Sequence, residues 1–162
     1  MAAPNFHRHA DFVQLFQDLA TAHVDIQGFY RGFSEEDHEK KHSFQTPALI
    51  LGGRDVDDVS DTIDSGRKHH TVSFFIVDKF EKGNPDSLDS TVEKCEEIAE
   101  EVFARILHHF QTNPQDGMLD PKTYSGFMVK HKVMSHIAGW IVEFTYLTEG
   151  KTRINPEKWQ AQ

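Results

Sequence analysis

The segment His38-Glu39-Lys40-Lys41-His42 matches the HExxH pattern of zinc-dependent hydrolases. On a helix, this spacing places both imidazoles on one face, where they can hold Zn²⁺ while Glu39 acts as a general base. The flanking residues are strongly polar, and Gln45 stands where the extended pattern has its glycine, with no third histidine behind it. A metal site needs a supporting shell that such flanks do not supply. We therefore expect no functional metal at His38 and His42, and a small zinc-dependent hydrolase remains the alternative function.

The other histidines and the single cysteine favour structural roles. Neighbouring histidines on a strand, such as His69-His70, point to opposite faces and cannot share one ion without distortion. The pair His108-His109 falls in the last turn of a predicted helix, where a cation interacts favourably with the helix dipole. Cys95 lies on an apolar helix face, which predicts a buried, inert thiol. The sequence has no phosphate-binding loop, dinucleotide-binding glycine pattern or nucleophile elbow. We expect no catalytic residues and no cofactor, and therefore a protein that is not an enzyme.

Composition narrows the class of protein further. The chain has 162 residues, of which 38% are hydrophobic, and its net charge of −9 argues against a nucleic-acid-binding surface. One cysteine excludes an internal disulfide framework and a multi-cysteine zinc site. Neither a signal-peptide pattern nor an apolar run of about 20 residues, the length of a membrane span, is present. We expect a soluble single domain over residues 1–162, made in a reducing compartment and without a membrane partner.

Two segments predict strands that have two distinct faces. In Trp140–Leu147, apolar side chains recur at every second position from Trp140, and the residues between them are mixed. Thr71–Asp78 is apolar on both faces. A small domain covers a second apolar face with a helix or with another subunit, so the pattern indicates a scaffold that assembles. The expected strands of the sheet are Ala48–Leu51, Val72–Phe80, Phe127–Met134 and Trp140–Leu147.

Two amphipathic helices are expected to pack on this sheet. Ala10–Asp25 carries apolar residues at i, i+3 and i+4. Ser90–Thr112 has an apolar stripe on one face and glutamates on the other, and Ser90 with Glu93 forms a capping box. The stripe expected to be buried includes Cys95, Ile98, Val102 and Ile106. The fold class is therefore α+β, a mostly antiparallel sheet packed by a long amphipathic helix plus an N-terminal helix.

Residues 52–70 form the longest segment without a regular pattern, which is either a long loop or an extended hairpin arm. Val56, Val59 and Ile63 are too sparse to build a core there, so the entropy of ordering the segment is not recovered within one subunit. We expect Gly53–His70 to be an assembly element that is poorly ordered in the isolated subunit. A polar C-terminal tail covers about residues 151–162.

The order of these elements resembles that of the tail terminator, or tail-completion, proteins of tailed phages, which join head to tail. The resemblance covers about Asp11 to Leu147. It rests on the N-terminal helix, the short strand led by Pro47, the long arm, the amphipathic helix and the closing hairpin that ends in Gly-Trp-Ile-Val-Glu-Phe at residues 139–144. Proteins of this family are small α+β subunits that form a ring, commonly hexameric, on the end of the tail tube. They have no catalytic residues.

The resemblance implies a structural virion subunit at the head–tail junction, assembled in the host cytoplasm. Its expected partners are copies of itself, tail tube proteins and neck or connector proteins, and DNA passes through the lumen without specific binding. A negative charge suits such a channel, because a basic lumen would bind phosphates. A long arm suits a cyclic, heterologous contact. The residues expected at the contact between subunits are Arg54, Val56, Val59, Ile63, Arg67 and Lys68.

Overall fold

The computed structural model describes residues 9–32, 44–59, 67–130 and 136–149. Its helices are α1 (His9–Ala22) and α3 (Pro85–Thr112), and its strands are β1 (Gly28–Arg31), β2 (Ala48–Val59), β3 (Arg67–Lys79), β4 (Met118–Leu119), β5 (Ser125–Lys130) and β6 (Ile137–Glu149). Two short 3₁₀ helices, η1 (Pro114–Asp116) and η2 (Pro121–Thr123), connect α3 to β4 and β4 to β5. The described residues form an α+β fold, as the sequence predicts.

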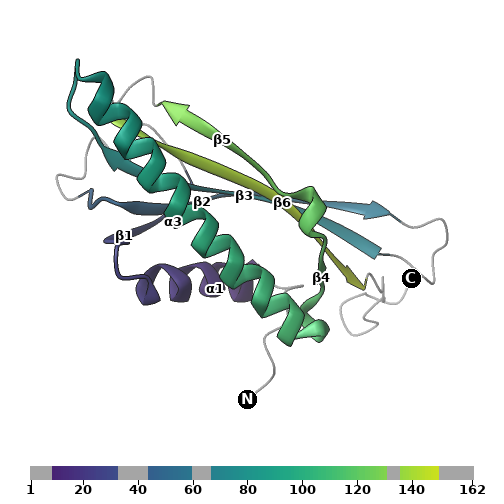
Figure 1. The fold of residues 1–162 in the computed structure, drawn as a ribbon. Helices are drawn as coiled ribbons and strands as arrows, with labels where there is room; N and C mark the ends of the chain where they lie inside the picture. The colour runs from purple at the N-terminus through teal and green to yellow at the C-terminus, as the bar shows by residue number, and fades with distance from the viewer. Residues whose placement is uncertain (1–8, 33–43, 60–66, 131–135, 150–162) are drawn as a thin grey trace, which may run out of the picture.

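The described strands form one six-stranded sheet in the order β1-β2-β3-β6, and both β4 and β5 pair with the remaining edge of β6. β1 runs parallel to β2, and the other pairs are antiparallel. β3 and β6 pair along their whole length, from Arg67 opposite Glu149 to Lys79 opposite Ile137. These two long strands therefore form the centre of the sheet. In Figure 1, α3 crosses the sheet diagonally, and α1 lies beside α3.

The main core lies between the sheet and the two helices. Val142, Phe144 and Tyr146 of β6 are buried there, which confirms the alternation predicted from the sequence. α1 contributes Phe12 and Phe16, whose rings lie 5.0 Å apart between centroids. The apolar stripe of α3 is also buried in this core, as predicted, and includes Cys95, Ile98, Val102 and Ile106.

The opposite face of the sheet carries a second, smaller apolar cluster. Its buried members are Ala48, Ile50, Val77 and Ile137. Tyr30 and Phe44 pack against them with ring centroids 4.8 Å apart, and the Tyr30 hydroxyl accepts a hydrogen bond from the backbone N–H of Gln45 at 2.9 Å. Further along this face, Ser73 and Glu143 are paired and half-buried. The mixed character of this face agrees with the two-sided pattern of the sequence.

The helices differ from their expected bounds mainly at the start of α3 and at the end of α1, whereas α3 ends at Thr112 as predicted. α3 begins at Pro85 rather than after Ser90, because the side chain of Asn84 accepts the N–H of Ser87 at 3.2 Å and Pro85 occupies the first turn. Proline fits there because its missing N–H has no partner in the helix. α1 ends at Ala22 rather than Asp25. Asparagine and proline together were therefore a stronger start signal than the serine and glutamate of the predicted capping box.

The segment expected to be irregular is, in its described part, a hairpin arm. β2 and β3 remain paired from Arg54 opposite Val72 to Val59 opposite Arg67. The register shifts between Leu51 and Arg54, and a side chain at Gly52 would collide with the Ser73 hydroxyl, so the close approach requires glycine. Figure 1 shows the paired ends of β2 and β3 extending away from the helices.

The structure gives residues 54–59 and 67–70 of this arm as paired strands, and the expectation that the arm is poorly ordered in the isolated subunit stays a prediction. That expectation counted only apolar side chains, whereas these strands are joined by backbone pairing. β3 is paired on both sides here, with β2 through Arg67–Val72 and with β6 through the same residues. Because each pairing satisfies backbone groups, the hairpin does not need an apolar core of its own.

β5 and β6 pair antiparallel, which confirms the expected closing hairpin, but the bounds of β5 differ from the prediction and a further short strand is present. β5 begins at Ser125, two residues before the predicted start, and residues 131–134 of the predicted strand lie outside the described part. β4, which was not predicted, pairs Met118 and Leu119 with Leu147 and Tyr146. β4 and β5 therefore share one edge of β6, each covering a different part of it.

Candidate assembly surfaces

The residues expected at the subunit contact lie in the hairpin arm, apart from Ile63, which is outside the described residues. They are Arg54, Val56 and Val59 of β2 and Arg67 and Lys68 of β3. Val59 of β2 lies opposite Arg67 of β3, so these two expected contact residues are neighbours at the far end of the arm. Arg67 is exposed there, and Lys68 is half-buried.

Arg54 is anchored inside the subunit. Its Nη1 donates to the Tyr146 hydroxyl at 3.3 Å, and its guanidinium carbon lies 5.4 Å from the centroid of the Phe12 ring, within the range of a cation–π contact. Burial raises the pKa of Tyr146 to about 12, although the nearby Arg54 lowers it, so the hydroxyl stays protonated at neutral pH. Arg54 therefore ties the base of the arm to the core.

His70 extends this internal support along β3. Its ring stacks on Tyr146 with centroids 4.5 Å apart, and its Nε2 lies 2.7 Å from the Thr148 hydroxyl. All three residues are buried. The arm is therefore held by aromatic and polar contacts on its helix-facing side in addition to the strand pairing.

The outer edge of β5 has no strand partner among the described residues. On β6, the N–H of Thr145 donates to the Thr123 hydroxyl at 2.9 Å, on the side where β4 and β5 lie. In a strand, the backbone N–H and C=O groups of successive residues point alternately toward its two neighbours. The odd-numbered residues of β6 therefore form hydrogen bonds with β5, and Phe127, which lies opposite Ile141, directs its backbone groups toward β6. The residues whose backbone N–H and C=O groups point away from the sheet are therefore Gly126, Met128 and Lys130.

β2 has a second open edge over its distal half. β1 pairs with β2 only as far as Leu51, and no described strand lies on that side beyond it. By the same alternation, the backbone groups of odd-numbered residues in β3 point toward β2. Asp57, which lies opposite His69, therefore directs its backbone N–H and C=O groups toward β3. The backbone groups of Val56 and Asp58 point outward.

Exposed apolar side chains gather on the β4–β5 edge. The large apolar side chains exposed in the described part of the chain are Val24, Met118, Phe127 and Met128. Met118 is 55% exposed, Phe127 45% and Met128 53%. Phe127 lies opposite Ile141 and Met128 opposite Trp140, so these two side chains lie on opposite faces of the sheet. An open edge that is apolar on both faces is the kind of strand that pairs with another chain.

The sequence-based assignment of contact residues missed this edge. Its only local signal is the pair of neighbouring apolar residues, Phe127 and Met128, in a short predicted strand. Whether such a strand lies at the edge or in the centre depends on which strands pair over long distances, and this information is not present in the local pattern.

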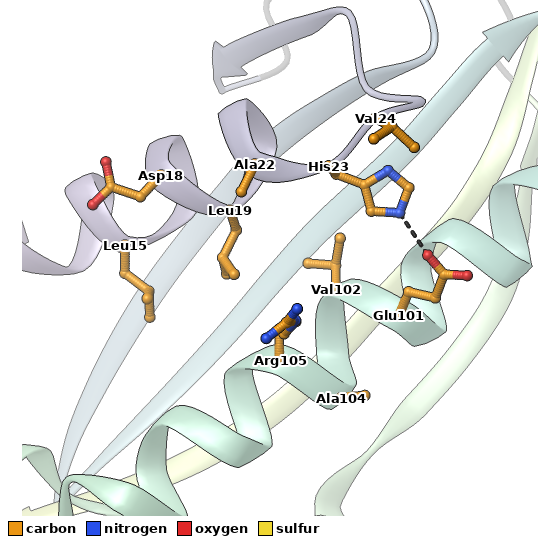
Figure 2. A pocket seen from close by; sticks show the side chains of 10 residues that line it. All are labelled: Leu15, Asp18, Leu19, Ala22, His23, Val24, Glu101, Val102, Ala104 and Arg105. Atoms are coloured by element: carbon orange, nitrogen blue, oxygen red, sulfur yellow. Dashed lines mark hydrogen bonds and ion pairs between the residues drawn. The ribbon is translucent and has the colours of Figure 1, made fainter.

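A groove of about 770 Å³ separates α1 from α3 (Figure 2). Leu15 and Leu19 of α1 face Val102 and Arg105 of α3 across it. At one end, His23 Nε2 lies 2.7 Å from a carboxylate oxygen of Glu101, and this pair links α3 to the residue after α1. The lining is mainly apolar, so the groove suits an apolar side chain better than a reaction of polar groups.

A buried carboxylate pairs with a histidine at the end of α3. Asp116 Oδ2 lies 2.8 Å from His109 Nε2, and Asp116 is buried while His109 is partly exposed. Gly117 follows with a φ of 136°, a conformation that favours glycine. The pair joins the last turn of α3 to η1 and leads the chain into β4. Its role is structural, which agrees with the role expected for His108-His109.

The metal-site hypothesis falls on residues that the structure does not describe, because His38, Glu39 and His42 all lie within 33–43. In the described ranges, no group of three or more His, Cys, Asp or Glu residues is placed to hold a metal ion. Cys95 is buried, as predicted, and burial followed by the charge of Asp78 raises the pKa of its thiol to about 12. No helix in the described part is long and apolar enough to cross a membrane.

Comparison with known proteins adds no assignment. The chain matches no protein-family model, and no curated protein matches it in sequence.

Proposed function

We propose that this chain is a structural ring subunit at the head–tail junction of a tailed phage, which terminates the tail tube and docks it to the connector while leaving a channel for DNA. One observation carries the proposal. Of the four large apolar side chains that are exposed in the described residues, three, Met118, Phe127 and Met128, lie on the edge formed by β4 and β5, instead of in a pocket lined by reactive groups. Such an edge is stabilised by pairing with another chain.

The order of the elements supports the phage assignment. A helix, a short strand led by Pro47, a long hairpin arm, a long amphipathic helix and closing strands are the features on which the resemblance to tail terminators rests. The observed order, from α1 through the β2–β3 hairpin and α3 to β6, agrees with it. The arm also extends beyond the part of the sheet that the helices cover, where it can reach a neighbouring subunit (Figure 1).

Surface charge supports the passage of DNA without binding. The outer face of α3 carries exposed glutamates, which are Glu93, Glu97, Glu100 and Glu101. With a net charge of −9, the chain repels phosphates more than it attracts them. A ring of such subunits would let DNA slide through its lumen.

The location of the protein in the particle is tested by labelling. Antibodies raised against the purified chain are bound to phage particles produced from the genome that encodes it, and the complexes are viewed by electron microscopy. We expect label at the junction of head and tail. Label confined to the capsid shell or tail fibres, or particles that lack the protein, would contradict the proposed function.

A further inference from the structure

We propose, on the basis of the ring proposed above, that neighbouring subunits join by pairing β5 of one copy antiparallel with the distal half of β2, Arg54–Val59, of the next. The contact would make one continuous sheet around the ring. Both edges are open among the described residues, and the two stretches have the same length, Ser125–Lys130 in β5 and Arg54–Val59 in β2.

The β5 edge supplies both backbone and side-chain contacts. Met128 directs its backbone N–H and C=O outward, and its side chain is half exposed on the helix-facing side of the sheet. Phe127 is exposed on the opposite side. A strand added at this edge would therefore bury apolar surface on both faces while satisfying the backbone groups, which is how extended segments add to sheets.

The β2 edge supplies backbone groups that match those of β5. Val56 and Asp58 direct their N–H and C=O groups outward, as Met128 does on β5, so antiparallel strands can exchange hydrogen bonds between these positions.

The strand order explains why the partner is another copy of the same chain. The path β2-β3-β6-β5 contains an even number of strands in antiparallel alternation. After β5, the next strand in such a sheet has the direction of β2. A second copy in the same orientation therefore continues the alternation, as rotation about a ring axis requires. Pairing of β5 with β5 would instead reverse the second copy and stop at a dimer.

The positions of the open edges indicate a staggered contact. β1 covers the start of β2, and β4 covers the part of β6 near Tyr146, so the open stretches lie at diagonally opposite corners of the sheet. Each copy would be displaced along the strands relative to the last one. Closed sheets accommodate this displacement by tilting their strands against the axis.

Cysteine cross-linking tests the contact directly. Cys95 is buried and its thiol has a pKa of about 12, so the native cysteine gives little background. Copies carrying Met128→Cys are mixed with copies carrying Val56→Cys or Asp58→Cys, the two outward positions of β2, and oxidised. We expect a disulfide-linked dimer only in the mixtures. A dimer from Met128→Cys copies alone indicates β5–β5 pairing and overturns the proposal.

A proline variant separates this inference from the proposed function. Met128→Pro removes an outward N–H that has no strand partner among the described residues, whereas Met128→Ala removes the same side chain and keeps the N–H. We expect Met128→Pro to remain folded, with a thermal midpoint close to that of Met128→Ala. We also expect it to form at least ten-fold less oligomer than Met128→Ala. Equal oligomer in the two variants, or rings that form without any mixed disulfide, would overturn the contact and leave the ring standing. A parent chain that stays monomeric would overturn both.

Discussion

Replacing Ile98 with Asp tests the packing of α3 on the sheet. Ile98 is buried in the main core together with Val102 and Ile106 of the same stripe. The change removes a buried aliphatic side chain worth about 1.5–3 kcal/mol. It also buries a carboxylate without a partner, which costs several kcal/mol more. Because domains of this size are stable by about 5–15 kcal/mol, the variant should lose most or all of its free energy of unfolding.

Urea denaturation followed by far-ultraviolet circular dichroism at pH 7 measures this loss. The matched control is Ala104→Asp, which introduces the same charge at an exposed position of the same helix and should lower the free energy of unfolding by only about 1 kcal/mol, through helix propensity and repulsion from Glu100. If Ile98→Asp is soluble and unfolds at the urea concentration of the parent, α3 does not pack on the sheet through this stripe, and the reasoning from burial is refuted.

Four further predictions concern the core and the metal hypothesis. Cys95 should not react with an aromatic disulfide reagent at pH 8 in the native protein, and one thiol per chain should react after denaturation; rapid native reaction would show that the thiol is accessible. Tyr146→Phe removes the hydrogen bond from Arg54 and should lower the free energy of unfolding by about 1 kcal/mol. Burial raises the pKa of Tyr146 in the folded state from 10.0 to about 12, so the hydroxyl ionises at lower pH in the unfolded chain. The parent should therefore lose free energy of unfolding between pH 10 and 12, and Tyr146→Phe should lose less. Equal losses in the two proteins would contradict the buried environment of Tyr146. Finally, purified protein dialysed against a weak chelator should contain no stoichiometric zinc by elemental analysis, and zinc that is retained by the parent but lost in His38→Ala would support the hydrolase alternative.

The sequence predicted the parts of the fold that depend on local periodicity. The alternation that begins at Trp140 identified β6 and its helix-facing side, and the 3.6-residue spacing around Ile98 identified the buried stripe of α3. Both patterns are strong because one face of each element is completely covered by the core. The start of α3 was predicted at Ser90, but the helix begins at Pro85, where Asn84 supplies the cap.

The parts that could not be predicted depend on long-range pairing. The arm was judged by its sparse apolar residues, but its strand β3 pairs with β6, a strand that lies more than 70 residues away in the sequence. For the same reason, β4 is too short to show a pattern, and the edge position of β5 could not be read from Phe127 and Met128 alone. The inward contact of Arg54 with Tyr146 joins two such distant strands.

The central claim, that this chain forms a closed ring, is tested most directly by the native mass of the purified full-length protein over a range of concentrations. A ring predicts one dominant species at a fixed whole multiple, larger than two, of the 18.6 kDa subunit, without a ladder of growing oligomers, because heterologous contacts stop adding copies once the ring closes. A monomer or a dimer at every concentration up to the millimolar range would contradict the ring and the function derived from it.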